Sequence, residues 1–539
     1  MRIAHKKNAP LEQKQRLSRS MLWKLQREFY EQTGVQAWNK EFVPRHVTSN
    51  PFIADAYAKV VCGFLRDCQA AGWQSARPSF APLDDSQPLY IVELGAGHGG
   101  FSYLFLKKFL KLYRNSLFKE IPVRYVMTDL AERNVESWPA HPRLQPFFEE
   151  GFLDVARFDA ERDDELTLRR SGATLSAGAV RNPVVLIANY VFDSIPQDAF
   201  AVEQGQLYES LITLSSNREA GEPVTFESLS DSEISYTSHP VGQTFYDDPD
   251  FDRILHDCQR RLPETAFLFP IASLRCVRNF QRLSGGRLLL LSGDKGYSRD
   301  EALLEGQGAP VIAVHAKGCF SMMVDYQIIG EYFLSQGGLA LNPTHSHESI
   351  SVSAFLLGDP PGGYAETRLA YAAEVEEFGP DDMFTLLSGV EQYLDALSLE
   401  QLVALLRLSG WDYRIFWNCL PALQAHAPSL SEEQKNTLSE AVRNVWDAYF
   451  PIGEEQDLAF RAGTLLYEIG FYSEALDFFR RSADLHGVAP GTAYNTALCY
   501  YGLRQMETSL EHIELALELD PESDAAKAMR IKLRSAMRR

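Results

Sequence analysis

Three polar side chains directly follow an apolar run, residues 183–188, that predicts a strand covered on both faces of a parallel sheet. Asn189, Tyr190 and Asp193 then lie where the side chains of such sheets face a ligand crevice. A carboxylate or amide oxygen there can orient a nitrogen nucleophile and stabilise developing positive charge. We therefore expect Asp193 to orient a substrate, with Asn189 or Tyr190 shaping the pocket. The alternatives are a helix cap for Asp193 and a core ring for Tyr190.

A second group of residues has the spacing of a ligand-binding turn. Residues 89–94 predict a buried strand, Gly95, Gly97 and Gly99 follow it, and residues 101–112 predict a helix with one apolar face. Glycine accepts a positive φ and has no Cβ to hold the backbone away from a ligand. The segment therefore predicts a binding turn at the carboxyl end of a parallel strand.

The acid before this turn bears on which ligand it binds. Gly100 completes a G-x-G-x-x-G spacing, which leaves a dinucleotide possible. Glu93, however, lies two residues before the first glycine. The resulting E-x-G-x-G-x-G pattern is similar to that of class I S-adenosyl-L-methionine-dependent methyltransferases. This resemblance implies that Glu93 compensates the positively charged methionine end of the cofactor.

The next two predicted strands add candidate cofactor contacts. Residues 122–128 predict a strand that runs into Asp129, where a carboxylate can hold ribose hydroxyls. The alternative for Asp129 is a helix cap. A third strand is expected at residues 143–148. In a methyltransferase of this class, the loop after it would place Phe152 or Asp154 beside the adenine, and Asp159 competes for that contact.

The segment 1–80 is expected to be a helical arm and lid. Its first 27 residues are basic, and a solvated helix over residues 11–33 is favoured over a mitochondrial presequence. A second helix is expected at residues 52–71, with Pro51 at its first position and Ser49 or Asn50 as its cap. The preceding loop would place Thr48 and Ser49 over the cofactor.

Composition limits the class of protein. A chain of 539 residues is expected to form about two to four domains. A net charge of −20 argues against nucleic-acid binding through phosphates, and no apolar run approaches the roughly 20 residues that a membrane helix needs. The seven cysteines are scattered without a C-x-x-C pair, so neither zinc nor disulfides are expected. We expect a cytoplasmic protein, or a mitochondrial matrix protein if it is eukaryotic.

Further strands are expected at 287–291 and 350–357, which predicts a Rossmann-like α/β domain over residues 81–360 with an insertion at about 197–285. The insertion begins with a hairpin around Gln204 and Gly205. Its polar part, residues 216–250, is interpreted as a substrate loop.

The C-terminal part is predicted to be entirely helical. Residues 380–450 form a connector, and residues 451–539 contain a repeat with a shift of 34 residues, in which Tyr472 aligns with Met506 and Gly463 with Ala497. This period resembles that of tetratricopeptide repeats. The resemblance implies a groove that docks a protein substrate or partner. A capping or dimerisation module is the alternative.

Together these motifs resemble the MidA-like methyltransferase family. The matching pieces are Thr48-Ser49-x-Pro51, the segment 93–99, and Asn189-x-x-Phe192-Asp193-x-x-Pro196, which resembles the family's Asn-Glu-Phe-Phe-Asp-Ala-Leu-Pro block. Ala96 and His98 replace the Pro and Arg expected in the glycine turn, and Tyr190 replaces the family's Glu. If that Glu binds the guanidinium of a substrate, the resemblance does not imply that this protein methylates arginine.

The family resemblance implies N-methylation of a protein side chain. Its cofactor would be S-adenosyl-L-methionine, held by Glu93, the three glycines and Asp129, with Ser49 and Asp154 as further contacts. The alternatives are a small-molecule methyltransferase and a non-catalytic scaffold.

Overall fold

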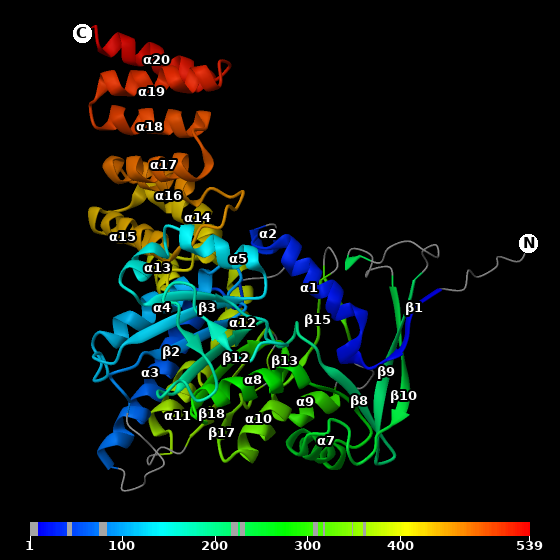
Figure 1. The fold of residues 1–539 in the computed structure, drawn as a ribbon. Coiled ribbons are helices and arrows are strands. Elements are labelled where there is room, and N and C mark those ends of the chain that lie inside the picture. Colours follow the sequence, from blue (N-terminus) through cyan, green and yellow to red (C-terminus); the bar gives the residue numbers. More distant parts are fainter. Residues whose placement is uncertain are drawn as a thin grey trace, which may run out of the picture. The chain divides into compact units, whose positions relative to one another are not determined.

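In the computed structural model, a seven-stranded sheet in the order β17-β18-β12-β7-β2-β3-β4 forms the centre of the first unit (Figure 1). Its strands are β2 (Leu89–Leu94), β3 (Val123–Asp129), β4 (Leu153–Arg157), β7 (Val184–Asn189), β12 (Leu288–Asp294), β17 (Leu339–Leu341) and β18 (Ser351–Leu357). β2 pairs in parallel with β3 on one side and β7 on the other, and only β18 runs antiparallel to β12 and β17. This doubly wound sheet confirms the predicted Rossmann-like α/β class, with a switch point at the end of β2.

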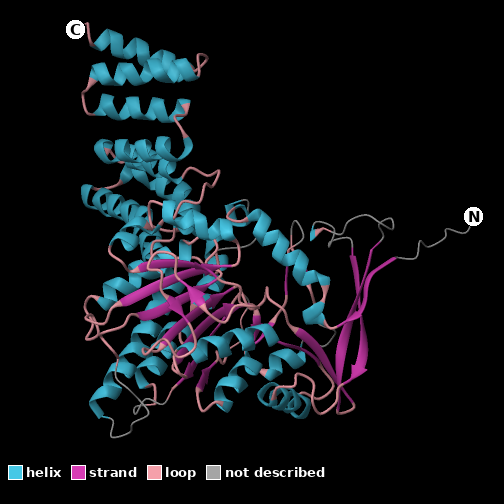
Figure 2. Ribbon diagram, viewed as in Figure 1, coloured by secondary structure: helices cyan, strands magenta, loops and turns pink. Residues whose placement is uncertain are grey.

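The structure describes residues 9–39, 46–74, 83–216, 225–226, 232–305, 311–315, 319–345, 347, 349–358 and 363–538. The chain divides into two units, Met1–Thr385 and Leu386–Arg539. Figure 2 shows that the first combines strands and helices. Within the described ranges, no helix has both the length and the hydropathy to cross a membrane.

The central strands are buried because helices cover both faces of the sheet. β2 and β12 are buried along their whole length, which explains their continuous apolar runs. The helices α3 (Pro51–Gln74), α4 (Gly100–Tyr113) and α11 (Ala365–Tyr371) pack together, with α3 against β12. The opposite face packs on α7 (Pro249–Arg261), α8 (Ile271–Leu283) and α10 (Tyr326–Ser335). Both ends of the glycine turn are therefore held by buried elements.

A second, antiparallel sheet comes from the insertion and the N-terminal segment (Figure 1). Its strands are β1 (Ala9–Gln15), β8 (Asp198–Glu203), β9 (Gln206–Ser216), β10 (Ser232–Pro240) and β11 (Ala266–Phe269). The predicted hairpin is confirmed, since Gln204 and Gly205 connect β8 to β9 with φ of 50° and 74°, as a type I′ turn requires. The expected substrate loop is partly a strand, because β10 pairs with β9; residues 217–224 and 227–231 lie outside the described residues.

Short elements complete the first unit. They are η1 (Leu17–Arg19), α1 (Met21–Thr33), α2 (Gln36–Asn39), α5 (Glu132–Ser137), α6 (Gln145–Glu149), α9 (Asp300–Glu305), and the two-residue ladders β5 (Leu166–Thr167) with β6 (Thr174–Leu175), β13 (Gly296–Tyr297) with β16 (Val324–Asp325) and β14 (Ala313–Val314) with β15 (Phe320–Ser321).

Two predictions about local structure are wrong. The solvated helix expected over residues 11–33 begins as strand β1, and α1 buries Leu22 and Phe29 against other elements. The strand expected at 143–148 is instead helix α6. Pro146 fits the first turn of a helix but would remove a hydrogen bond from a central strand. The third parallel strand therefore starts later, at Leu153.

The second unit is helical throughout its described residues (Figure 2). Its main helices are α12 (Pro380–Val390, shared with the first unit), α13 (Leu399–Leu408), α14 (Tyr413–His426), α15 (Glu432–Ala448), α16 (Leu458–Glu468), α17 (Tyr472–His486), α18 (Pro490–Gly502), α19 (Met506–Leu519) and α20 (Asp524–Ala536). The helices α17 and α19 begin at the two aligned positions of the repeat, and a Cβ at Gly463 would come within 2.9 Å of the Phe479 ring. One apolar core joins α13 to α17, so the predicted connector packs beneath the repeats.

Asn50 is predicted to stabilise both α3 and the loop before it. Its side-chain oxygen accepts hydrogen bonds from the backbone nitrogens of Phe52 and Ile53, and its nitrogen donates to the His46 and Val47 carbonyls. Asn50→Ala should lower the free energy of unfolding of the first unit by about 1 kcal/mol, as measured by urea titration. Asn436→Ala, at an exposed position of α15, is the control and should change it by less than about 0.5 kcal/mol. An equal effect of both changes would contradict the capping role.

Candidate functional site

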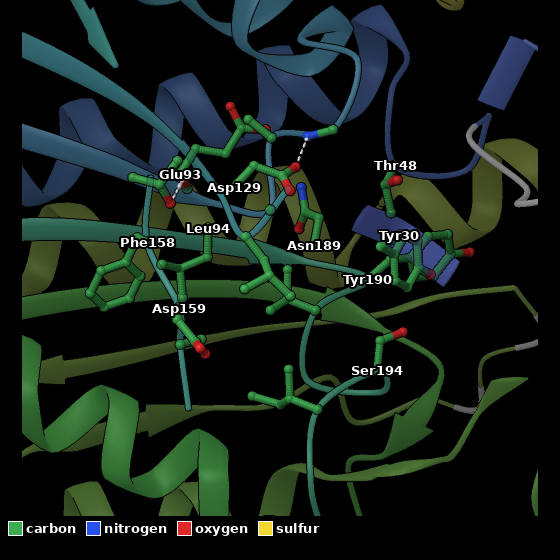
Figure 3. A pocket seen from close by; sticks show the side chains of 18 of the residues that line it. Tyr30, Thr48, Glu93, Leu94, Asp129, Phe158, Asp159, Asn189, Tyr190 and Ser194 are labelled. Atoms are coloured by element: carbon green, nitrogen blue, oxygen red, sulfur yellow. Dashed lines mark hydrogen bonds between the residues drawn. The ribbon is translucent and has the colours of Figure 1, made fainter. Parts of the chain in front are cut away.

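A cavity opens at the carboxyl ends of β2, β3 and β7, at the switch point of the sheet (Figure 3). It encloses about 1130 Å³ of empty space, including its open mouth. Four segments line it: the glycine turn, the loops after β3 and β4, the loop after β7, and the N-terminal helices with the Thr48 loop. These distant parts of the sequence converge as expected for a ligand site in this type of sheet.

The glycine turn has the backbone conformation that its sequence predicts. Gly95, Gly97 and Gly99 have φ of 59°, 56° and 87°, which only glycine adopts without strain. A Cβ on Gly95 would come within 2.8 Å of Val191, and one on Gly97 within 2.9 Å of Trp38. Gly95 and Gly97 line the cavity, whereas Gly99 is packed under Met127 and caps α4. The first two glycines therefore face the cavity, whereas the third packs against Met127.

Glu93 lies beneath this turn. It is only 5% exposed, lines the cavity, and accepts hydrogen bonds from the hydroxyls of Ser102 and Tyr125, the latter at 2.7 Å. Burial raises the pKa of Glu93 to about 7, against the two hydrogen bonds, which lower it. The carboxyl group is therefore poised to ionise near neutral pH when a positive charge approaches.

Asp129 joins the glycine turn to the end of β3. Its carboxylate accepts a hydrogen bond from the backbone nitrogen of Gly97 at 3.0 Å (Figure 3). It also accepts from the backbone nitrogen of Ala131 at 2.8 Å and from the Asn134 amide at 3.1 Å. Burial raises the pKa of Asp129, whereas these donors lower it. The residue lines the cavity at the position predicted for the ribose contact.

The end of the cavity beside β4 contains Asp159 and not Asp154. Asp154 is fully buried within β4, where it accepts hydrogen bonds from the backbone nitrogens of Arg170 and Ser171, so the structure contradicts its expected place beside the ligand. The misplaced third strand explains this error. Asp159, the competing candidate, lines the cavity, and Arg27 donates to its carboxylate at 2.7 Å.

The loop after β7 supplies the other end of the cavity. Asn189, Tyr190 and Ser194 all line it. The Asn189 oxygen accepts a hydrogen bond from Tyr57 at 2.8 Å, while its buried Nδ2 has no partner among the described residues. Tyr190 has φ of 52°, a strained conformation for a residue other than glycine. This end therefore offers an uncommitted amide donor and neutral hydroxyl groups.

Asp193 does not line the cavity, although the sequence predicts that it contacts the substrate. It accepts a hydrogen bond from the Ser194 hydroxyl at 2.7 Å, and it interacts electrostatically with the buried carboxyl of Asp294, at the end of β12. Burial raises the pKa of Asp193 to about 6, and burial together with the charge of Asp193 raises that of Asp294 well above its ordinary range. Asp193 can therefore act on a ligand only through Ser194.

The N-terminal helices cover the cavity, whereas the sequence predicts a solvated arm over residues 11–33 and a lid formed by the Thr48 loop. We call the residues that they contribute the roof: Trp23, Gln26, Arg27, Tyr30 and Trp38. The first four have the 3-, 4- and 7-residue spacing of one helix face, a signal present in the sequence. Thr48 and Ser49 also line the cavity. The expected lid is therefore built mainly by α1 and α2.

Arg27 attaches this roof to the loop after β4. It pairs with Asp159 at 2.7 Å and with Glu161 at 2.8 Å, and the Gln26 side chain exchanges two hydrogen bonds with the Phe320 backbone. In the part of the chain that the structure describes, no three His, Cys, Asp or Glu side chains are grouped to hold a metal ion.

No family model matches this chain. Among solved structures, a protein of Burkholderia thailandensis is similar at 12% identity over 65% of this chain and 94% of its own, with a TM-score of 0.36. Another from that organism, a candidate methyl transferase bound to S-adenosyl-homocysteine, has 14% identity over 63% and 92%, with a TM-score of 0.35. Intraflagellar transport protein 70A of Danio rerio is 40% identical to this chain over 65 residues. The match covers 12% of this chain and 10% of the length of that relative. The functional conclusion therefore rests on the cavity.

Glu93 is predicted to make stability depend on pH. Its pKa is raised from 4.5 to about 7 in the folded protein, so ionisation of the buried carboxyl destabilises the fold as the pH rises through this window. Glu93→Gln should match the wild type near pH 5 and exceed its free energy of unfolding by up to about 3 kcal/mol near pH 8, in urea titrations. Glu136→Gln, at an exposed position of α5, should give the same difference at both pH values. A pH-independent effect of Glu93→Gln would show that folding does not raise the pKa of this carboxyl.

Proposed function

We propose that this protein is an S-adenosyl-L-methionine-dependent methyltransferase. The observation that carries the proposal is the glycine turn at the switch point, with Glu93 beneath it and Asp129 bound to the Gly97 nitrogen. Gly95 and Gly97 let a ligand approach this backbone closely, whereas a Cβ at either position would collide with a neighbour. The donor and acceptor groups along the cavity also match the chemistry of this cofactor.

The residues that would hold the cofactor follow from their chemistry. Glu93 would compensate the amine at the methionine end, since its carboxyl can ionise near neutral pH. Asp129 would accept from the ribose hydroxyls, and Asp159 with Phe158 would border the base, because all three line the same cavity. When bound, the cofactor supplies a methyl group on a positively charged sulfur. The chain itself has to orient the acceptor and exclude water.

We further propose that the acceptor is a nitrogen on a protein side chain. The end of the cavity beside β7 presents the Asn189 amide and the hydroxyls of Tyr190 and Ser194, and Ser194 is hydrogen-bonded to Asp193. A proton that leaves the nitrogen can therefore pass through Ser194 to a buried carboxylate. The 34-residue period of α17 and α19 supports recruitment of a protein through the second unit. A small-molecule acceptor and a non-catalytic role are the rival outcomes.

Calorimetric titration of the full chain tests the cofactor. S-adenosyl-L-methionine should bind and NAD should not. Binding should weaken roughly tenfold between pH 8 and pH 5.5, because protonation of Glu93 removes the charge that compensates the amine. Glu93→Gln should bind with the weaker affinity at both pH values, and Glu136→Gln should behave as the wild type. Binding of NAD alone, or of neither ligand, would refute the proposal.

Transfer of a radiolabelled methyl group to proteins of a cell extract tests the acceptor. The full chain should label discrete proteins, whereas a chain ending at Val390, after α12, should bind the cofactor but lose that labelling. Labelling that persists would place recruitment in the first unit. Label found only in small molecules would favour a small-molecule methyltransferase. The absence of any label would favour a non-catalytic role.

A further inference from the structure

Trp38 lies directly over the glycine turn. A Cβ built on Gly97 would come within 2.9 Å of the Trp38 ring, and the ring contacts His98 edge-on at 5.9 Å between centroids. A ligand that crosses this turn must therefore touch the indole, which lines the same cavity as Glu93 and Asp129. Trp38 is thus a ligand-facing residue contributed by a short helix outside the central fold.

Tyr30 extends this aromatic surface toward the loop after β7 (Figure 3). Its ring stacks on Trp38 with 6.3 Å between centroids and an interplanar angle of 28°. Burial raises the pKa of its hydroxyl well above the ordinary range. The hydroxyl therefore stays neutral, and the two rings form one continuous surface, the aromatic wall.

The acidic groups of the cavity are already engaged by other donors. Asp129 accepts three hydrogen bonds from its own loops, and Arg27 pairs with both Asp159 and Glu161. Asp193 is turned away from the cavity toward Asp294. In the proposed cofactor the sulfur links the ribose to the amine-bearing chain, so it would lie between Asp129 and Glu93, beneath Trp38. At that point, the described residues that can attract a positive charge are the Glu93 carboxyl and the faces of the two aromatic rings.

We infer that Trp38 and Tyr30 form an aromatic wall that recognises the positive charge on the sulfur of the methyl donor. The inference rests on the proposed function. Ring faces attract a cation through their quadrupole, and the attraction is strongest where water is excluded. Methyl transfer breaks the carbon–sulfur bond and leaves its electron pair on sulfur, while the acceptor nitrogen gains the methyl group and loses a proton. The sulfur of the product is then neutral, so the wall holds the donor more tightly than the product.

Calorimetry with S-adenosyl-L-methionine and S-adenosyl-L-homocysteine tests the wall without any acceptor, because the two ligands differ at the sulfur only. In Trp38→Leu, the affinity for the methylated ligand relative to the demethylated one should fall by about 3- to 30-fold compared with the wild type. Trp38→Phe, which keeps a ring, should retain most of this preference. Tyr30→Leu should lose part of it and Tyr30→Phe should not, because the ring and not the hydroxyl provides the attraction.

Phe158→Leu is the matched control, since it removes a ring that lines the opposite end of the cavity. It should weaken the binding of both ligands equally and leave the ratio of their two affinities unchanged. If Trp38→Leu also weakens both ligands equally, the indole contributes contact area alone and the inference is overturned. If the wild type binds neither ligand, the proposed function fails and the wall fails with it, which distinguishes this result from a failure of the wall alone.

Discussion

The candidate site depends on one buried carboxylate that holds two loops together. Asp129 ends β3, and by accepting from the Gly97 nitrogen it fixes the turn that follows β2; the Ala131 nitrogen and the Asn134 amide hold the carboxylate itself in place. On its other side the turn is held by the Trp138 indole nitrogen, which donates to the Gly97 carbonyl at 3.0 Å. The shape of the cavity, the contacts of its roof and the position of Glu93 all depend on the turn keeping this position.

Around this anchor, burial raises the pKa values of several carboxyl groups at and behind the cavity. Burial raises the pKa of Glu93 to about 7 and that of Asp193 to about 6, and burial with the charge of Asp193 raises the pKa of Asp294 well above its ordinary range. A desolvated carboxyl is neutral until a cation compensates it. The buried Glu93 carboxyl at this cavity therefore favours a ligand that brings positive charge.

Sequence reasoning found the parts of this site that local patterns encode. The strand, glycine turn and helix around Gly97, the acid at Asp129 and the polar residues after β7 each follow from apolar runs and from the chemistry of single residues. Asp154 was misplaced because Pro146 starts a helix where a strand was expected. The roof was missed because its contacts, such as Gln26 with Phe320, join residues 294 positions apart, and no local pattern encodes such a pairing. Asp193 turns away for the same reason, since its partner Asp294 belongs to another strand.

The antiparallel pairing of β1 with β9 has a consequence for the order in which the molecule assembles. Residues near the beginning of the chain pair with residues about two hundred positions later, as Ala9 does with Ser216, and the Arg27 and Gln26 contacts also wait for later segments. Closing such long loops costs entropy before any contact compensates for it. During synthesis, the roof helices must therefore remain unpaired until the ribosome has delivered β9 and Phe320. The cavity therefore forms only after these later segments are made, although the helices that cover it are made before them.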